Sequence, residues 1–488
     1  MKFKSILAAG SAAMAVATAI AVSTTPAMAQ QTDASIRGTV VDANGAPVSG
    51  AQVTITHKPS GTSGSASTTG TGTFFEGGLR VGGPYSVTIT APGYEPQTVE
   101  GVYLDPGETE RLVVNLADLA ATDEILVIGR RSEQLDLNGG AGSSFDKETI
   151  QDQPAVSRDI IQTLLRDPLV NTQDGKTAIS VAGVNPRYNA LAVNGVLQQD
   201  DFGLSNSLYP TSRSTISLDA VEVASVVASD YSVKSSGFQG GLVNVVTKSG
   251  SNDLTGTAYW YRSGQNFLGE LSDGTSVPAS EFKEREYGAT LGGPIIRDKL
   301  FFFVAYEDFK TSAPVNFAGN DASNLITNAD GFFSKLNADI LAGTGFDAGG
   351  RPSSTATPET SKRWIGKIDW NITDDHRMEA SYQRSRETGT SVSSLSLTSA
   401  WYDIPQELDV YSGGIYSDWT DSFSTTLRVG YKEYTKGQIC RAPSDFGEIQ
   451  MRFTGAELIA AGYDGLVDPL MPEKTFVAGC DRFRHGNT

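Results

Sequence analysis

The 488-residue sequence predicts a mainly β protein: an N-terminal β-sandwich, a small α/β domain and the first part of an antiparallel transmembrane β-barrel. Three observations lead to this prediction. From about residue 254 onward apolar and polar residues alternate, so that each strand has one apolar and one polar face. The connections between these strands are short and long in turn, as in outer-membrane barrels. No stretch after the N-terminus has eighteen consecutive apolar residues, and a membrane protein without spanning helices must close a barrel.

Residues 1–29 have the features of a secretory signal peptide. Lys2 and Lys4 precede an Ala-rich apolar run from Ile6 to Val22, and Ala27-Met28-Ala29 forms a small-x-small cleavage site. The alternative is a retained membrane helix, but the run is diluted by Ala, Thr and Ser and no basic flank follows it. We therefore expect the chain to be exported and this segment to be removed.

Residues 33–117 are predicted to form a β-sandwich of about seven short strands. The turn sequence Asp42–Gly45 and the break at Pro92-Gly93 separate runs such as Tyr85–Ile89, in which apolar and polar residues alternate. Gly38–Ala51 and Gly93-Tyr94 make this region resemble the carboxypeptidase regulatory-like domain. That resemblance implies an immunoglobulin- or transthyretin-like module, a carbohydrate-binding-like fold, and not a peptidase, because His57 alone cannot build a zinc site.

Residues 118–142 are predicted to be a linker that contains a short β-prone segment. Such a segment can add itself as a strand to the sheet edge of a partner. It resembles the TonB box of TonB-dependent receptors, and its residues are Asp123, Glu124, Ile125, Leu126, Val127, Ile128 and Gly129. The alternative is a plain linker or a last strand of the sandwich.

Residues 143–250 are predicted to form a compact α/β unit. Ser157 can cap a helix with an apolar stripe that ends before Pro168, and Asn194-Gly195 predicts a type I′ hairpin. Further strands are predicted at Leu218–Val223 and Gly240–Gly250. Together these segments resemble the plug domain of TonB-dependent receptors.

The plug departs from the family pattern at several positions. Ala182 stands where the family usually has Arg, Asn194 where it has Asp, and Ala224–Asp230 where it has Gly-Pro. Ionic contacts of the family's plug therefore cannot be transferred to this chain. At the predicted apex of the plug, the candidate ligand contacts are Asp200, Asp201 and Phe202, with a solvated loop as the alternative.

Residues 251–488 are predicted to supply about seven barrel strands. These are Leu254–Arg262, Glu284–Gly293, Lys299–Phe309, Arg363–Ile372, His376–Arg386, Leu408–Trp419 and Phe423–Tyr434. The long connections, expected at the cell surface, are Ser263–Lys283, Lys310–Lys362 and Glu387–Glu407. The segment Thr290–Phe303 resembles the Oar-like branch of the TonB-dependent receptor family, which also carries the additional N-terminal domain.

The number of strands also predicts that the sequence is C-terminally truncated. Plugged transporters close with about 22 strands, and bacterial single-chain barrels have an even number. We therefore expect a curved open sheet beside the plug, and a separate sandwich. The two cysteines, Cys440 and Cys480, follow the last predicted strand, and in an exported chain they are expected to form a disulfide; two free thiols are the alternative.

Several function classes are excluded. The net charge of −18 argues against nucleic acid as a partner. Gly175-Lys176-Thr177 lacks the upstream glycine of a phosphate loop, and the three histidines fall in three different modules, so neither a catalytic residue nor a metal or cofactor site is predicted.

The family resemblance implies an outer-membrane, TonB-dependent receptor or transporter of a Gram-negative bacterium. Its implied partners are the periplasmic domain of TonB with its inner-membrane energising complex, outer-membrane lipid, and an external ligand. The alternative function is an outer-membrane adhesin or surface assembly protein that binds through the sandwich and the long loops.

Overall fold

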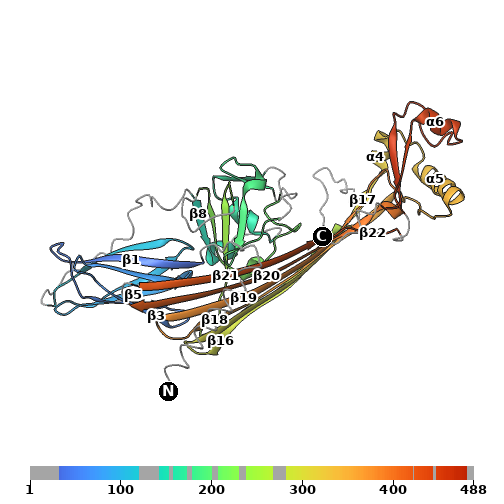
Figure 1. Ribbon diagram of the computed structural model, residues 1–488. Coiled ribbons are helices and arrows are strands. Elements are labelled where there is room, and N and C mark those ends of the chain that lie inside the picture. The colour runs from blue at the N-terminus through green and yellow to red at the C-terminus, as the bar shows by residue number, and fades with distance from the viewer. Residues whose placement is uncertain are drawn as a thin grey trace, which may run out of the picture.

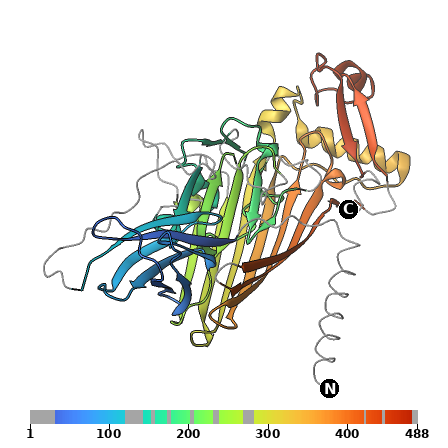
Figure 2. The ribbon, with the colours of Figure 1, turned by 60° about the vertical axis from the view of Figure 1, so that its left-hand side comes forward.

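The computed structural model describes residues 32–119, 142–152, 158–172, 178–200, 207–229, 238–267, 282–420, 423–442 and 447–480. A long curved sheet is its largest element (Figure 1). The plug lies on one face of the sheet, the sandwich lies at one end, and a small helical cap lies at the other end. Figure 2 shows the same arrangement from a second direction. The predicted mainly β fold is confirmed.

The sandwich consists of two sheets. One sheet has the order β4-β1-β7, and its strands are β1 (Asp33–Asp42), β4 (Thr73–Arg80) and β7 (Thr109–Leu116). The other has the order β3-β2-β5-β6, and its strands are β2 (Gln52–His57), β3 (Thr62–Ser67), β5 (Gly82–Thr90) and β6 (Gln97–Leu104). Alternate residues point inward, and Val53, Ile55, Val87 and Ile89 are completely buried between the sheets.

The plug is built on a five-stranded sheet of order β12-β11-β14-β13-β8. Its strands are β8 (Gly142–Asp146), β11 (Ala190–Val193), β12 (Val196–Leu197), β13 (Val221–Val227) and β14 (Leu242–Thr247). The other elements are α2 (Lys147–Gln151), α3 (Ile160–Leu164), the strand pair β9 (Val170–Thr172) and β10 (Ile179–Val181), and the 3-10 turns η1 (Pro186–Tyr188) and η2 (Leu218–Ala220).

Three local predictions in the plug have different outcomes. Asn194 and Gly195 have φ angles of 45° and 80°, which agrees with the predicted type I′ hairpin. The cap of α3 is Asp159, whose side chain accepts a hydrogen bond from the Ile161 backbone, whereas Ser157 lies outside the described residues. The strand predicted from Leu218 begins at Val221, because the preceding residues form η2.

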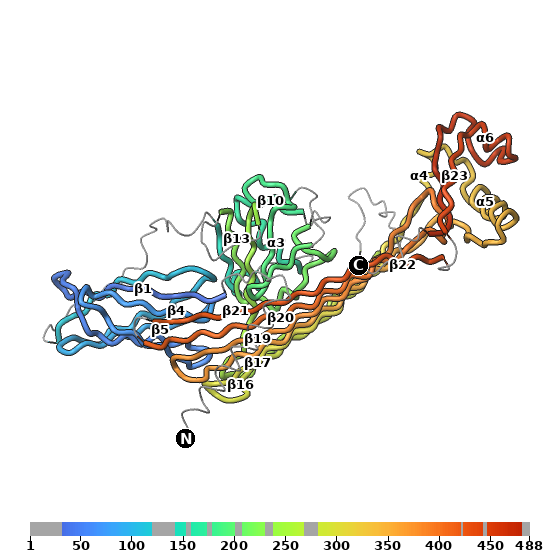
Figure 3. The backbone as a smooth tube through the Cα atoms, in the orientation of Figure 1, coloured from blue at the N-terminus to red at the C-terminus, as the bar shows by residue number. Residues whose placement is uncertain are grey.

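The long sheet is an antiparallel meander in which consecutive strands pair (Figure 3). The strands are β15 (Thr255–Gly264), β16 (Lys283–Ile296), β17 (Leu300–Asn316), β18 (Ser354–Asn371), β19 (His376–Ser391), β20 (Tyr402–Thr420) and β21 (Phe423–Lys436). All seven of these strands were predicted, and β15 and β21 are the edges of the meander. An eighth, short strand of the same sheet, β22 (Ile439–Cys440), pairs with β20 and was not predicted. Most of the seven are longer than predicted on the side of the long connections, where β17 continues to Asn316 and β18 starts at Ser354.

The long connections beyond β17, β19 and β21 do not remain irregular loops. They fold together into one unit, here called the cap, whose described residues are 317–353, 394–401, 437–442 and 447–480. Its elements are α4 (Ala318–Ser323), α5 (Ala329–Thr344), η4 (Thr398–Ala400), β22 (Ile439–Cys440), β23 (Ile449–Phe453), α6 (Gly455–Ala460) and β24 (Lys474–Ala478). Phe332, Leu336, Leu397, Tyr463 and Phe476 share its apolar core.

A disulfide joins Cys440 of β22 to Cys480 beyond β24, with their Cα atoms 6.0 Å apart. The cysteines are 40 positions apart in the sequence, so the disulfide closes a loop that contains β23, α6 and β24 of the cap. Within the described residues, no helix is both long enough and apolar enough to span a membrane.

Candidate functional site

In the long sheet the apolar face is exposed and the charged face is buried, which is the reverse of what is found in a water-soluble protein. On β18 the apolar side chains Trp364, Ile368 and Trp370 are 38%, 46% and 41% exposed. The charged side chains that alternate with them, Arg363 and Asp369, are buried at 2% and 0%. Charged side chains are almost never fully buried unless paired, and large exposed apolar surfaces mark contact with a membrane or a partner.

An aromatic row crosses the exposed face of this sheet. Register pairs Tyr306 with Trp364 and Tyr382 with Tyr411, which in turn pairs with Tyr431. Neighbouring rings lie close together: 4.6 Å separates the centroids of Trp364 and Tyr382, and 4.6 Å those of Tyr382 and Tyr411. Toward the short turns the same face carries apolar residues, namely Ile368, Ile415, Leu427 and Val429. A row of aromatic residues beside an apolar band is typical of the lipid-facing surface of an outer-membrane barrel.

The buried polar face of the sheet contacts the plug. On this face Arg363 of β18 forms an ion pair with Glu307 of the neighbouring strand β17, with a nitrogen–oxygen distance of 2.6 Å. Arg363 also donates a hydrogen bond of 2.9 Å from Nη1 to the Ile216 carbonyl of the plug. Gln383 of β19 continues the contact, because its Nε2 donates to the Thr215 carbonyl at 3.0 Å. Two small apolar clusters lie beside these polar contacts: Ala220 packs against β17 and β18, and Val196 packs against β20. Buried polar and charged groups therefore make a large part of the contact between plug and sheet, and apolar packing makes the rest.

Two arginines of the plug complete this network at Glu286 of β16. Arg158 lies 3.6 Å and Arg213 lies 3.2 Å from the Glu286 carboxylate. Arg158 also pairs with Asp219 at 2.8 Å. Burial disfavours the charged form of Arg158, but the Asp219 carboxylate raises its pKa, so the guanidinium stays charged.

Asn194, at the position where the family usually has Asp, makes a neutral contact between the plug and the sheet. Its Nδ2 donates to the hydroxyl of Thr247 at 2.9 Å and to that of Ser381 at 3.2 Å. Its Oδ1 accepts a hydrogen bond of 3.0 Å from the Thr247 backbone. The substitution therefore keeps a hydrogen-bonded contact with the wall without placing a charge there.

The predicted ligand contacts are only partly described. Asp200 follows β12 at the end of a described segment, whereas Asp201, Phe202 and the whole box-like segment 123–129 lie outside the described residues. Beside Asp200, the Gln199 carbonyl accepts a hydrogen bond of 2.8 Å from Lys432 of β21. Binding by these residues remains a prediction.

The sandwich is docked on the sheet and the plug, so the expectation of a separate sandwich is wrong. Arg80 at the end of β4 lies 3.6 Å from Asp369 and donates a 3.0 Å hydrogen bond to Asn371. Arg377 of β19 donates to the Gly78 carbonyl of the sandwich at 3.2 Å. Val223 and Val246 of the plug sheet are buried in the apolar core of the sandwich. The sequence could not reveal this docking, because its partners are about 290 positions apart.

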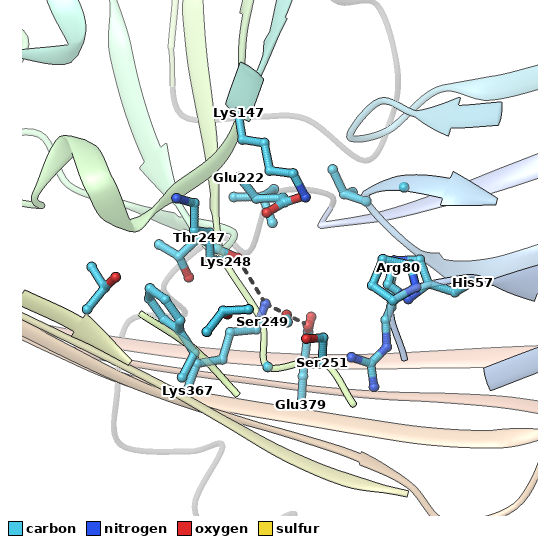
Figure 4. A pocket seen from close by; sticks show the side chains of 18 of the residues that line it. His57, Arg80, Lys147, Glu222, Thr247, Lys248, Ser249, Ser251, Lys367 and Glu379 are labelled. Atoms are coloured by element: carbon cyan, nitrogen blue, oxygen red, sulfur yellow. Dashed lines mark hydrogen bonds and ion pairs between the residues drawn. The ribbon is translucent and has the colours of Figure 1, made fainter. Parts of the chain in front are cut away.

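A cavity of about 390 Å³, here called the junction cavity, lies where sandwich, plug and sheet meet (Figure 4). His57 lies on its sandwich side, where its ring is 4.8 Å from that of Tyr85 and its Nδ1 is 2.7 Å from the Ser60 hydroxyl. Burial, together with the nearby Arg80, lowers the pKa of His57 to about 3. The imidazole is therefore neutral at physiological pH.

Comparisons with known proteins identify two regions of the chain. Residues 35–117 match the carboxypeptidase regulatory-like domain, and residues 246–345 match the outer membrane beta barrel domain. The chain combines these two domains. It is also 22% identical over 368 residues to the TonB-dependent transporter Oar of Myxococcus xanthus, a match that covers 72% of this chain. The predicted resemblances to the regulatory-like domain and to the Oar-like branch are thus confirmed.

The chain spans about a third of the length of Oar, because the match covers 33% of that protein. Similar solved structures include the outer membrane transporter YddB from Escherichia coli, with 11% identity, a TM-score of 0.44, and coverage of 60% of this chain and 39% of that one. The siderophore receptor PirA from Acinetobacter baumannii has 19% identity and a TM-score of 0.42, over 68% of this chain and 43% of the receptor. These relatives are transporters and receptors, not enzymes.

The residues that join the barrel domain to the plug were not predicted individually. Arg363, Glu307 and Glu286 were recognised only as polar positions of predicted strands. A signal for them existed, because a charged residue on the polar face of a membrane strand faces the barrel interior. The sequence could not show which plug residue each one meets.

Proposed function

We propose that this protein is an outer-membrane receptor and transporter of a Gram-negative bacterium. It binds an external ligand and imports it when TonB captures residues 123–129 and pulls on the plug. The observation that carries the proposal is the inverted burial of the long sheet, whose apolar face is exposed while its charged face holds a plug. A domain held on the polar face of such a sheet would block passage until it moves, which supports a transport function.

The chemistry of the plug interface suits a movable part. Polar and charged contacts can be exchanged for water at a small net cost, because a typical hydrogen bond contributes only about 0.5–1.5 kcal/mol after hydration is counted. An apolar interface of the same size would resist opening by its full hydrophobic free energy. The contacts of Arg363, Gln383 and Asn194 with the plug are all of the exchangeable kind.

The place of the box-like segment gives the pull a defined point of action. The segment lies between β7 of the sandwich and β8 of the plug, and β8 is an edge strand paired only with β13 within the described part of its sheet. In this antiparallel pair of β13 and β8, Val223 lies opposite Asp146 at one end and Val227 lies opposite Gly142 at the other. A force applied to the linker therefore acts first on β8, which can peel from β13 before the inner strands of the plug are loaded.

Deletion of Asp123–Gly129 tests the proposal. Cells that carry the deletion are expected to lose uptake of a labelled ligand pool of siderophores, oligosaccharides and peptides, while binding at the cell surface survives. The control is deletion of Ser132–Asn138, which removes the same number of residues from the same linker. Equal uptake by cells with the deletion of 123–129 and cells with the control deletion would refute TonB coupling. If the protein without any deletion binds ligand at the cell surface but imports none, the adhesin function is favoured.

A further inference from the structure

The junction cavity has an excess of positive charge in a chain whose overall charge is −18. Its lining includes five basic side chains: Arg80, Lys147, Lys248, Lys367 and Arg377. Among the described lining residues two are acidic, Glu222 and Glu379. Asp369 of the sheet does not line the cavity but pairs with Arg80. When Asp369 is counted with the two acidic lining residues, the five basic side chains still leave an excess of two positive charges.

The basic groups come from all three parts of the molecule. Arg80 belongs to the sandwich, Lys147 begins α2 of the plug, and Lys367 lies on β18 of the sheet, and Figure 4 shows them around the same space. Lys147 lies 3.1 Å from Glu222, and Lys367 lies 3.5 Å from Glu379. Each of these lysines can still donate further hydrogen bonds, because an ammonium group has three donors.

The arginines have unused donors in the same place. Arg80 is 6% exposed, yet its Nε donates no hydrogen bond to the described residues, and its Nη1 makes only the 3.6 Å ion pair with Asp369. Nη2 of Arg377 is likewise without a described acceptor. A buried guanidinium with unused N–H groups is costly unless an acceptor completes it, and carboxylates and phosphates fit its donor geometry.

A second cavity, of about 440 Å³, shares Arg80 and Arg377 with the junction cavity and is also lined by Lys299. Its lining has the opposite character, because five carboxylates face it: Glu76, Asp298, Asp374, Asp375 and Asp418. The basic groups are therefore not spread evenly around the docked sandwich. Arg80 and Arg377 line both cavities, whereas Lys147, Lys248 and Lys367 line only the junction cavity, which therefore has the positive excess.

We infer that the junction cavity is a binding site for a small anion that carries a phosphate or carboxylate group. The anion accepts hydrogen bonds from Arg80 and Arg377 and is flanked by Lys147 and Lys367. Because the sandwich supplies Arg80, the site exists only when the sandwich is docked, and the anion holds the three parts together. His57, being neutral, adds no charge and leaves the arginines as the principal donors.

The test is calorimetric titration of the full chain, purified in detergent at low salt, with inorganic phosphate and separately with citrate. Saturable binding of at least one probe is expected, with a Kd of about 1 mM or tighter. Arg80→Gln should weaken it by roughly tenfold or more, since it removes a charged donor. Lys147→Gln should weaken it by about threefold to tenfold without undocking the sandwich, because that side chain is 31% exposed.

The matched control is Lys58→Gln. Lys58 belongs to the same sandwich, is 49% exposed, and pairs with Glu100 outside the junction cavity. It should leave anion binding unchanged. Absence of saturable binding of both probes, or an equal loss in Lys58→Gln and Lys147→Gln, would overturn the inference. The measurement needs neither TonB nor a transported ligand, so absence of anion binding would leave the proposed function standing. Conversely, deletion of residues 123–129 should leave anion binding intact.

Discussion

Replacement of Arg363 by Met should loosen the plug more than any other single change at its contact with the sheet. Arg363 and Glu307 have side chains that are 2% and 0% exposed, and 2.6 Å separates their charged atoms. At that distance their attraction is roughly 6 kcal/mol with an effective dielectric constant of about 20, and desolvation of both ions offsets most of it. The variant removes the attraction but keeps the desolvation of Glu307. A loss of about 3–5 kcal/mol is therefore expected.

A double-mutant cycle separates this cause from general damage. Glu307→Gln combined with Arg363→Met removes both charges, so the pair should cost less than the sum of the two single variants. The readout is the free energy of plug release, obtained from the urea dependence of protease cleavage within residues 142–250. The control is Arg384→Met, whose ion pairs with Asp409 at 3.5 Å and Glu407 at 3.8 Å are partly exposed and should contribute less than about 1 kcal/mol.

A cost below about 1 kcal/mol for Arg363→Met would contradict a strong, desolvated ion pair. A double variant that costs as much as the two single variants together would contradict it as well. Either result would mean that Glu307 is hydrated, or that it finds another partner when Arg363 is gone.

Three further outcomes are expected. Thiol labelling of folded, unreduced protein should find neither Cys440 nor Cys480, and opening their loop should destabilise the cap by about 3–4 kcal/mol in the chain-entropy model; two reactive thiols would contradict this. Protease added to intact cells should cut the long connections before it reaches Pro294–Asp298, and cutting only after permeabilisation would reverse the orientation. Because the pKa of His57 is lowered in the folded sandwich, the unfolded sandwich binds a proton at acidic pH that the folded one does not. The contribution of His57 to stability should therefore be constant above about pH 7 and fall as the pH drops from about 6.5 toward 3, so that the loss is less steep in His57→Gln. An equal slope in both proteins would exclude His57 as the cause.

The strands could be predicted because their signal is local. Alternation along Arg363–Ile372 or Phe423–Tyr434 depends only on the two faces of each strand, and it identified the seven strands of the meander, though not the short β22. The hairpin at Asn194-Gly195 was equally local, since its φ angles follow from the two residue types. The additional length of β17 and β18 was missed, because beyond the membrane zone the two faces of a strand no longer differ in polarity.

The cap was not predicted, although one of its helices has a local signature. Asn328 caps α5, Gly345 ends it in a left-handed conformation, and Phe332, Leu336 and Ile340 lie on one buried side. The core of the cap, however, joins residues from three separate connections. The association of these connections is a tertiary property, which the pattern within each connection does not show.

Fluorescence quenching by lipids with brominated acyl chains tests the central claim most directly, which is that the apolar face of the long sheet meets the membrane. Single-tryptophan variants of the protein in bilayers would retain Trp364, Trp370 or Trp401 in turn. Trp364 and Trp370 lie on the exposed face, whereas Trp401 is 2% exposed inside the cap. The structure predicts strong quenching of Trp364 and Trp370 and none of Trp401. Unquenched Trp364 and Trp370, or quenching of Trp401 to the same degree, would contradict the account.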